Sequence, residues 1–296
     1  MRELVLAVFR AGRFTPAAPY QRFAYGCAAL LVLSGLFHLG VYVVDGGPWE
    51  GPVSWRKPVV FGLSFGIAVA TISWFMTFLR PHRAVGWLVL GLYSLAATGE
   101  VFLISMQRWR GVPSHFNEST PFNEMVFSYM GMLVTLIGVL TVAVAIWAWI
   151  HLDAPPSLAL AIRLGLVLML VSQGVGMQMI AEGGNTFGAA GAMKLPHAVT
   201  LHAAQVLPAL AIILLAAPGK ELSRLRTVEL GVSGYAAITG ATLVQTYAGR
   251  GPTELDLATF ALALAGLLML VTSFVVAFYR LADSAEPIRR AHALRR

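Results

Sequence analysis

Eight apolar stretches, each about as long as a bilayer-spanning helix, constrain this chain more than any other feature of its sequence. A helix needs roughly 20 apolar residues to cross the hydrocarbon core. The stretches lie near residues 23–44, 58–79, 85–106, 125–150, 159–181, 197–216, 227–248 and 257–279. Each is too long and too continuous to be a strand of an outer-membrane barrel. We therefore predict an all-α fold: a polytopic integral membrane bundle of eight transmembrane helices without a soluble domain.

Composition agrees with a membrane protein and restricts its partners. The chain is 57% hydrophobic and 12% charged, whereas soluble proteins carry about 25% charged residues. The lipid bilayer is therefore the first expected partner, and the net charge of +7 predicts contact with anionic lipids. No soluble segment combines basic and aromatic residues into a platform for nucleic acid. The single cysteine, Cys27, excludes a disulfide within the chain and two-cysteine redox chemistry.

Basic residues indicate how the helices are oriented, because cytoplasmic loops are enriched in Lys and Arg. With the N-terminus inside, 15 of the 21 Lys and Arg residues lie on the cytoplasmic side. The six outer ones are Arg56, Lys57, Arg108, Arg110, Lys194 and Arg250. We predict a multi-pass protein of the cytoplasmic (inner) membrane of a prokaryote-like cell, with both termini in the cytoplasm. Residues 1–22 do not have the pattern of a cleaved signal peptide, and residues 3–14 are expected to lie on the inner surface.

Landmarks of the first half of the chain recur in the second half in the same order. Pro58 precedes Gln107 by 49 residues, and Pro196 precedes Gln245 by 49 residues. Units of four helices keep the same orientation, so we predict two parallel four-helix repeats related by an axis along the membrane normal. The predicted parts are an N-terminal cytoplasmic or interfacial segment (1–22), a first half (23–152), a second half (153–280) and a basic cytoplasmic tail (281–296).

Strongly polar side chains within the spans gather at one depth, in the half that faces away from the cytoplasm. Polar groups in hydrocarbon are costly, so a cluster of them marks a cavity, a cofactor or a path. The inner half contains mainly Ser and Thr, which can bond to their own backbone. The outer layer contains three histidines, one glutamate and five of the six glutamines: His38, His197, His202, Glu100, Gln107, Gln173, Gln178, Gln205 and Gln245.

The histidines and the glutamate are the candidate cofactor-binding residues. Imidazole at this depth needs a hydrogen-bond partner, a metal or an iron porphyrin. His197 and His202 are roughly 140° apart around a helix, so they cannot bind one metal together without distortion. His38 and His202 are the candidate metal ligands, and Glu100 is either a proton carrier or the partner of a histidine. Pro208 is expected to kink the sixth span near these groups. The alternative for every one of these residues is a satisfied structural hydrogen bond.

The loop from Arg108 to Glu124 is the longest outside the membrane, and its aromatic residues suggest a lid. Its polar residues Arg108, Arg110 and His115 are candidate substrate-binding residues, together with the five glutamines of the outer layer. A basic rim for propionates, phosphates or other anions can be formed by Arg56, Lys57, Arg108, Arg110 and Arg250. The alternative is that they extend to lipid headgroups.

The layout resembles the heme A synthase family. Members have eight spans in two four-helix halves, a histidine near the start of the second and sixth spans, and a glutamine-to-glycine motif that ends the third and seventh. His197 and the segments 107–111 and 245–249 match this plan. The resemblance implies heme at His197. Val59 replaces the first-half histidine, the fourth and eighth spans lack histidine, and the loop cysteines are missing, so the paired-ligand sites are not retained in their usual form.

Two classes of function follow from the polar layer. The first is a redox or metal protein that holds heme or a transition metal in the outer half of the bilayer. The second is a permease, channel or receptor for a small polar or amphipathic solute. A third possibility is a structural membrane subunit that supports other membrane subunits.

Overall fold

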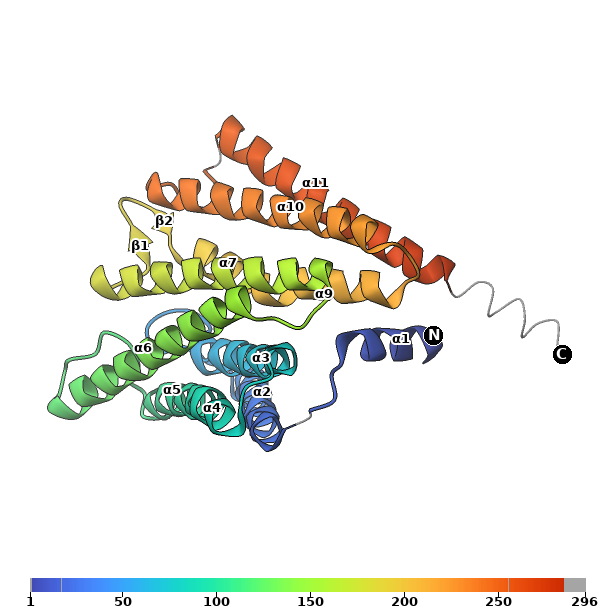
Figure 1. The fold of residues 1–296 in the computed structure, drawn as a ribbon. Helices are drawn as coiled ribbons and strands as arrows, with labels where there is room; N and C mark the ends of the chain where they lie inside the picture. The colour runs from blue at the N-terminus through green and yellow to red at the C-terminus, as the bar shows by residue number, and fades with distance from the viewer. Residues whose placement is uncertain (1, 17, 255, 285–296) are drawn as a thin grey trace. The chain divides into compact units, whose positions relative to one another are not determined.

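The computed structural model describes residues 2–16, 18–254 and 256–284. Long α-helices make up most of it, with one small β-hairpin (Figure 1). The chain divides into two compact units. The N-terminal unit comprises residues 15–144, and the C-terminal unit comprises residues 1–14 and 145–296.

Helices of the N-terminal unit form a bundle with a close helix pair at its centre. The unit contains α2 (Pro19–Asp45), α3 (Arg56–Leu79), α4 (Arg83–Gly86), the π-helical turn η1 (Trp87–Gly91), α5 (Leu92–Trp109) and most of α6 (Pro121–Ile150). The segments α4, η1 and α5 join into one helical span. α3 packs along α2 and against α5. α6 adds Val126 and Met130 to a small apolar core with Ile104 of α5.

Helices of the C-terminal unit include one that is interrupted. The unit contains α1 (Arg2–Gly12), the end of α6, α7 (Pro156–Ala181), β1 (Thr186–Phe187), β2 (Gly191–Ala192), α8 (Lys194–Leu201), α9 (Ala203–Ala216), α10 (Glu221–Tyr247) and α11 (Leu257–Asp283). α10 and α11 run side by side, and α7 packs against α8 and α9 (Figure 1). The two short strands pair antiparallel with Thr186 opposite Ala192.

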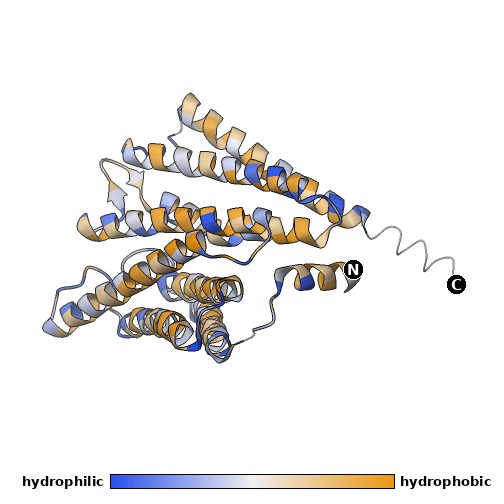
Figure 2. Ribbon diagram, in the orientation of Figure 1, coloured by the Kyte–Doolittle hydropathy of each residue, from blue (hydrophilic) through white to orange (hydrophobic). Residues whose placement is uncertain are grey.

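Seven helical segments of the described chain are long and apolar enough to cross a membrane. Apolar residues predominate along these helices (Figure 2). The protein is therefore an integral, multi-pass membrane protein, as predicted. The remaining long helix is α10, whose first nine residues include Glu221, Arg224, Arg226 and Glu229. Its crossing of the membrane, and therefore the count of eight spans, stays a prediction, as does the orientation of the termini.

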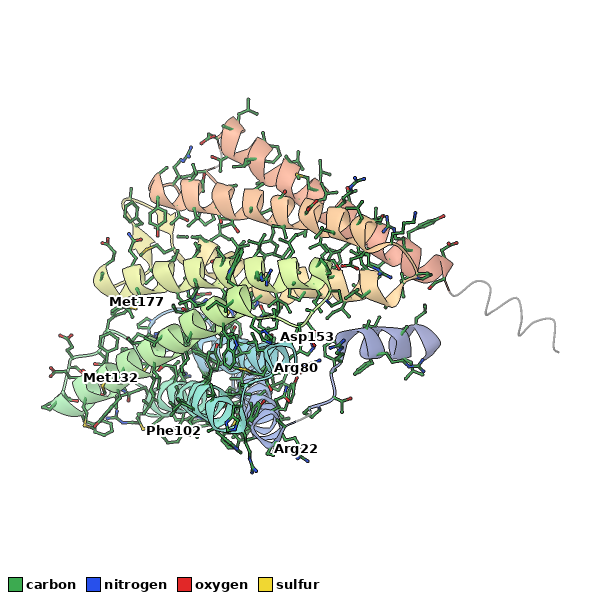
Figure 3. All side chains as sticks on the ribbon, in the orientation of Figure 1. Arg22, Arg80, Phe102, Met132, Asp153 and Met177 are labelled. Atoms are coloured by element: carbon green, nitrogen blue, oxygen red, sulfur yellow. The ribbon has the colours of Figure 1, made fainter. Side chains whose placement is uncertain are left out.

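Large apolar side chains on the spans point outward, where a bilayer would cover them. Phe102 of α5, Met132 of α6 and Met177 of α7 are 65%, 57% and 49% exposed (Figure 3). In water such exposure would be unfavourable, whereas hydrocarbon accepts these side chains without cost. The outward faces are thus consistent with contact with lipid.

Glycines allow neighbouring helices to touch through their backbones. A Cβ atom built on Gly62 of α3 would lie 2.8 Å from the backbone nitrogen of Gly35 on α2, and one on Gly66 would lie 2.9 Å from the carbonyl oxygen of Ala28. Gly62 and Gly66 therefore form a small-residue face for close packing of α3 against α2.

The ends of α5 and α10 share a local backbone conformation. Gly111 and Gly249 have φ values of 71° and 70°. The carbonyl of Gln107 accepts a hydrogen bond from Val112 five residues later, and that of Gln245 accepts one from Arg250. These are the left-handed helix ends that glycine favours. The similarity is local, and the duplication of whole four-helix halves stays a prediction.

Candidate functional site

The predicted sixth span is two helices that meet at His202. α8 ends at Leu201, α9 begins at Ala203, and His202 between them has φ −81° and ψ −4°. The carbonyl oxygen of Val199 accepts a hydrogen bond of 2.6 Å from the Tyr235 hydroxyl of α10. A side chain from another helix thus satisfies a backbone group beside the break, which is how interrupted helices are tolerated at membrane depth.

Pro208, where the sequence predicts a kink, lies inside α9, six residues after this break, and removes the hydrogen bond to the carbonyl four residues earlier. A kink at Pro208 stays a prediction. At the break itself, His202 keeps backbone angles of the right-handed helical region, and Tyr235 bonds to the chain beside it. An imidazole therefore sits at the discontinuity itself.

His197, on α8, has one ring nitrogen fixed and the other available. Its Nδ1 lies 2.8 Å from the carbonyl oxygen of Ser172 on α7, and a carbonyl can only accept, so Nδ1 carries the proton. The Ser172 hydroxyl donates to the backbone carbonyl of His197, also at 2.8 Å. Nε2 of His197 makes no hydrogen bond among the described residues. This tautomer leaves the lone pair on Nε2, as in histidines that bind metals.

The surroundings of His197 leave room for its ring. A Cβ atom at Gly176 of α7 would lie 3.2 Å from the imidazole Cε1. Ser172 is fully buried and His197 is half-buried. His202 is near enough to interact electrostatically with His197. α7 and the break between α8 and α9 therefore bring two imidazoles into one region of the C-terminal unit.

Three predicted glutamines of the C-terminal unit lie on the helices around this region. The hydroxyl of Tyr247 on α10 donates to Oε1 of Gln178 on α7 at 2.5 Å, so this amide links two helices. Gln173 is half-buried on α7, and Gln205 is half-buried in the first turn of α9. Gln205 is the glutamine closest in sequence to the break.

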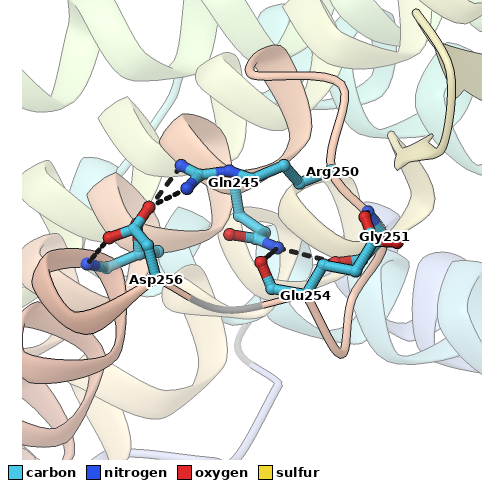
Figure 4. A network of polar contacts seen from close by, with 6 residues as sticks. Gln245, Arg250, Gly251, Glu254 and Asp256 are labelled. Carbon is cyan, nitrogen blue, oxygen red and sulfur yellow. Dashed lines mark hydrogen bonds and ion pairs between the residues drawn. The ribbon is translucent and has the colours of Figure 1, made fainter.

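Gln245 has a structural role in the connection between α10 and α11 (Figure 4). Its Nε2 donates to the carbonyls of Gly251 at 2.6 Å and Glu254 at 2.9 Å. Arg250 forms an ion pair with Asp256, and Asp256 caps α11 by accepting from the backbone nitrogen of Thr259 at 2.9 Å. The amide of Gln245 therefore holds the loop in place, and only its Oε1 has no partner among the described residues.

His38, in the N-terminal unit, uses both ring nitrogens. Nδ1 donates to the Ser34 carbonyl at 2.7 Å, and Nε2 accepts from the indole N–H of Trp109 at 3.0 Å. The Trp55 ring packs edge-on against Trp109, and the Arg108 guanidinium lies 3.8 Å from the centre of the Trp55 ring. A metal or heme at His38 Nε2 would therefore have to replace Trp109.

A polar network joins the end of α5 to the start of α6. Gln107 donates to the Asn123 side-chain oxygen at 3.2 Å. Arg110 donates to the same oxygen at 2.8 Å and also to Oε1 of Gln107. Asn123 in turn donates to the Ser119 hydroxyl at 3.0 Å. Gln107 and Asn123 are buried, so their mutual bonds account for Gln107 without a ligand.

His115 lies in the loop between α5 and α6, outside the membrane-spanning segments. Its ring packs against Phe61 of α3 with 5.4 Å between ring centres, and its Nδ1 is 2.9 Å from the Ser114 hydroxyl. Burial lowers the pKa of His115, and the positive charge of Lys57 lowers it further, to about 4. His115 is therefore neutral at physiological pH, and its role in binding a substrate stays a prediction.

Glu100 stands alone among the predicted site residues. It is fully buried on α5, and neither carboxyl oxygen has a hydrogen-bond partner among the described residues. Both nitrogens of His38 are engaged elsewhere, so no hydrogen bond joins this glutamate to that histidine. The alternative of a His–Glu pair is thus not realised with His38.

Sequence reasoning missed several residues that position the predicted ones. Ser172, Gly176 and Tyr235 fix the surroundings of His197 and His202, and Trp109 and Trp55 enclose His38. Small and aromatic residues are common in membrane helices, so none of them carried a distinct signal. The cavity, cofactor site or path that the polar layer indicates stays a prediction, because the residues of that layer are distributed over both units.

Among residues 2–16, 18–254 and 256–284, no group of three or more His, Cys, Asp or Glu side chains is arranged to hold a metal ion. Comparisons with protein families, with curated proteins and with solved structures find no match for the chain. The function therefore has to be inferred from the geometry of its own residues.

Proposed function

We propose that this membrane protein binds heme through Nε2 of His197 and takes part in redox chemistry. The observation that carries the proposal is the hydrogen bond from Nδ1 of His197 to the Ser172 carbonyl, which leaves the Nε2 lone pair without a partner among the described residues. A histidine that only stabilised the helices would be expected to use both nitrogens, as His38 does.

The donor set favours heme over a metal ion held by the protein alone. A bare metal site needs three or four protein ligands, and the described residues contain no such group. Iron in a porphyrin already has four ring nitrogens and needs only one or two axial ligands from the protein. The one available imidazole of His197 therefore suits heme.

Each neighbouring residue has a defined task in this proposal. The Ser172 carbonyl fixes the tautomer of the His197 ring, and the Ser172 hydroxyl bonds to the backbone carbonyl of His197. Gly176 leaves space that a methyl group would take from the ring. Bound heme would supply the capacity to gain and lose one electron, and the buried helices would control its access to water. The resemblance to heme A synthases implies the same histidine.

Binding of a small polar solute at the same region is the second candidate. The observation that favours it is the break at His202, because discontinuous membrane helices commonly form the binding sites of transporters. Gln205, Gln178 and Gln173 would then contact the solute, and a structural role is expected if neither heme nor solute binds.

The visible absorption spectrum of the purified protein tests the proposal. We expect a Soret band in the wild type, or after addition of hemin, and a loss of most of that band in His197→Gly. Added imidazole should restore the band in this variant, because free imidazole can occupy the vacated ligand position. A variant that had merely misfolded would not be rescued in this way.

Two further variants serve as controls. His151→Ala removes an exposed histidine after α6 and should retain the band. His38→Ala should also retain it, because Trp109 occupies Nε2 of His38. Equal spectra of wild type and His197→Gly, or a wild type that takes up no hemin, would overturn the proposal. Loss of solute uptake in Gln205→Ala would then favour the second candidate.

A further inference from the structure

Within the part of the chain that the structure describes, Glu100 is the one buried acid that neither the fold nor the proposed heme site explains. It lies within the span from Arg83 to Trp109, nine residues before the end of α5, which places it about 14 Å along the helix from that end. Its side chain is fully buried, and both oxygens lack hydrogen-bond partners among the described residues. An isolated ionised carboxylate in such surroundings is far less stable than in water.

We propose that Glu100 is a protonated carboxylic acid that exchanges its proton with water, which makes it a proton-binding site inside the N-terminal unit. The neutral acid is the form that can remain in apolar surroundings without a cation. An apolar side chain would fill the same space without leaving polar atoms unbonded. Intramembrane acids of this kind commonly serve proton transfer.

The same face of α5 carries a second buried polar residue nearer the helix end. Gln107 is seven residues later, which is two helical turns and about 10.5 Å, and it is fully buried. Gln107 bonds to Asn123 and Arg110, and Arg110 is exposed. Ile104 lies between Glu100 and Gln107 on this face and is fully buried in an apolar core, so water would have to enter that core for a proton to pass between the two residues. Beyond that core, the network of Gln107, Asn123 and Arg110 reaches the protein surface.

Other titratable groups on the packed helices do not take the place of this acid. α2 contributes Tyr20, Arg22, Tyr25, Cys27, His38, Tyr42 and Asp45, α5 itself contributes Tyr93 and Arg108, and α6 contributes Glu124 and Tyr129. α3 has no titratable residue between Pro58 and Leu79. None of these spans contains a lysine or arginine at the level of Glu100, so a proton is the simplest partner for its charge. The proposal is independent of heme binding by His197.

Infrared spectroscopy of the purified full-length protein in lipid tests the proposal directly. A protonated carboxyl has a C=O stretching band that ionised carboxylates lack, and this band shifts when deuterium replaces the proton. We expect the wild type to show the band at neutral pH and to shift it in D₂O. Glu100→Gln should lose one carboxyl band, whereas Glu118→Gln, which changes an exposed loop acid, should leave it unchanged.

A hydrophobic carbodiimide provides a second measurement that does not depend on a variant. The acid O–H adds across one N=C bond of the reagent, with the oxygen bonding to carbon and the proton moving to nitrogen, and the adduct rearranges to an N-acylurea without a leaving group. Mass spectrometry should find the reagent on the peptide that contains Glu100. If Glu100→Gln fails to fold, the wild-type infrared spectrum and the labelled peptide still test whether Glu100 is protonated.

Two results would overturn the proposal. Absence of the carboxyl band in the wild type would mean that Glu100 is ionised and paired with a cation. A band that does not shift in D₂O over hours would mean that the acid is sealed from water and only structural. A shifted band that is also lost in Glu100→Gln would support it.

Discussion

The indole N–H of Trp109 donates a 3.0 Å hydrogen bond to Nε2 of His38, and the same histidine donates from Nδ1 to the Ser34 carbonyl at 2.7 Å. The ring of His38 therefore carries its proton on Nδ1 and is satisfied on both sides. His197 has the same tautomer, but its Nε2 is unoccupied among the described residues. Two histidines that look alike in the sequence thus differ in what they can bind.

Removal of the Trp109 donor should destabilise the protein. Trp109→Phe keeps an aromatic ring but leaves Nε2 of His38, a residue only 4% exposed, without its donor. We expect a loss of about 1–3 kcal/mol in unfolding free energy. Thermal or denaturant unfolding in detergent measures it. Trp147→Phe is the control, because the Trp147 indole makes no hydrogen bond among the described residues, and equal losses in both variants would contradict the expectation.

The break between α8 and α9 should loosen when its hydroxyl donor is lost. Tyr235→Phe removes the 2.6 Å hydrogen bond to the Val199 carbonyl and little else. We expect faster amide hydrogen exchange around residues 199–206 and a destabilisation of about 1–2 kcal/mol. Tyr279→Phe changes a tyrosine that is 72% exposed and should have no such effect. Unaltered exchange in Tyr235→Phe would show that the break needs no support.

Two glycine substitutions should differ sharply in their effect on the stability of the protein. Gly62→Ala places a Cβ atom 2.8 Å from the Gly35 backbone, so α2 and α3 would have to move apart, at a cost of about 1–3 kcal/mol. Gly131→Ala on α6 meets no atom within 4 Å and should be neutral or slightly stabilising. Melting temperatures of the two variants measure the difference. Similar values would mean that α2 and α3 do not approach as described.

Stability should fall in mild acid because of His115. Its folded-state pKa is about 4, below the ordinary value of 6.5, so the unfolded chain binds a proton that the folded loop does not. The unfolding free energy should therefore decrease as pH falls from 6.5 to 4, by at most about 1.4 kcal/mol per pH unit. Melting temperatures across this range check it. Lys57→Met removes a charge that lowers this pKa and should weaken the dependence, and an unchanged slope would assign the effect to other groups.

Reporter fusions should establish the orientation of the spans. The excess of basic residues on one side predicts that fusions after Arg83 and after Arg226 lie in the cytoplasm and that a fusion at Asn117 lies outside. The fusion after Arg226 tests whether an even number of spans precedes α10. An external signal there would reverse the second half of the bundle.

The sequence by itself determined the class of fold, the approximate extent of the long helices and the residues worth testing. Apolar runs of bilayer length permit few structures other than helices, because backbone groups in hydrocarbon must bond within their own segment. Helix ends were less certain, since polar residues such as Arg56 and Glu221 extend a helix beyond its apolar part. The spacing of Gly62 and Gly66 also indicated a face for close helix packing, since only small residues allow two helices to approach so closely.

Only the tertiary structure decided what each polar residue does. Periodicity places His38 and His197 within helices but gives no information about the partners of their nitrogens, which come from Trp109 on α5 and Ser172 on α7. It also could not locate the break at His202, because the stabilising hydroxyl comes from Tyr235, far away in the chain. Hydrogen bonds between helices depend on which faces meet, and a single sequence does not specify those faces.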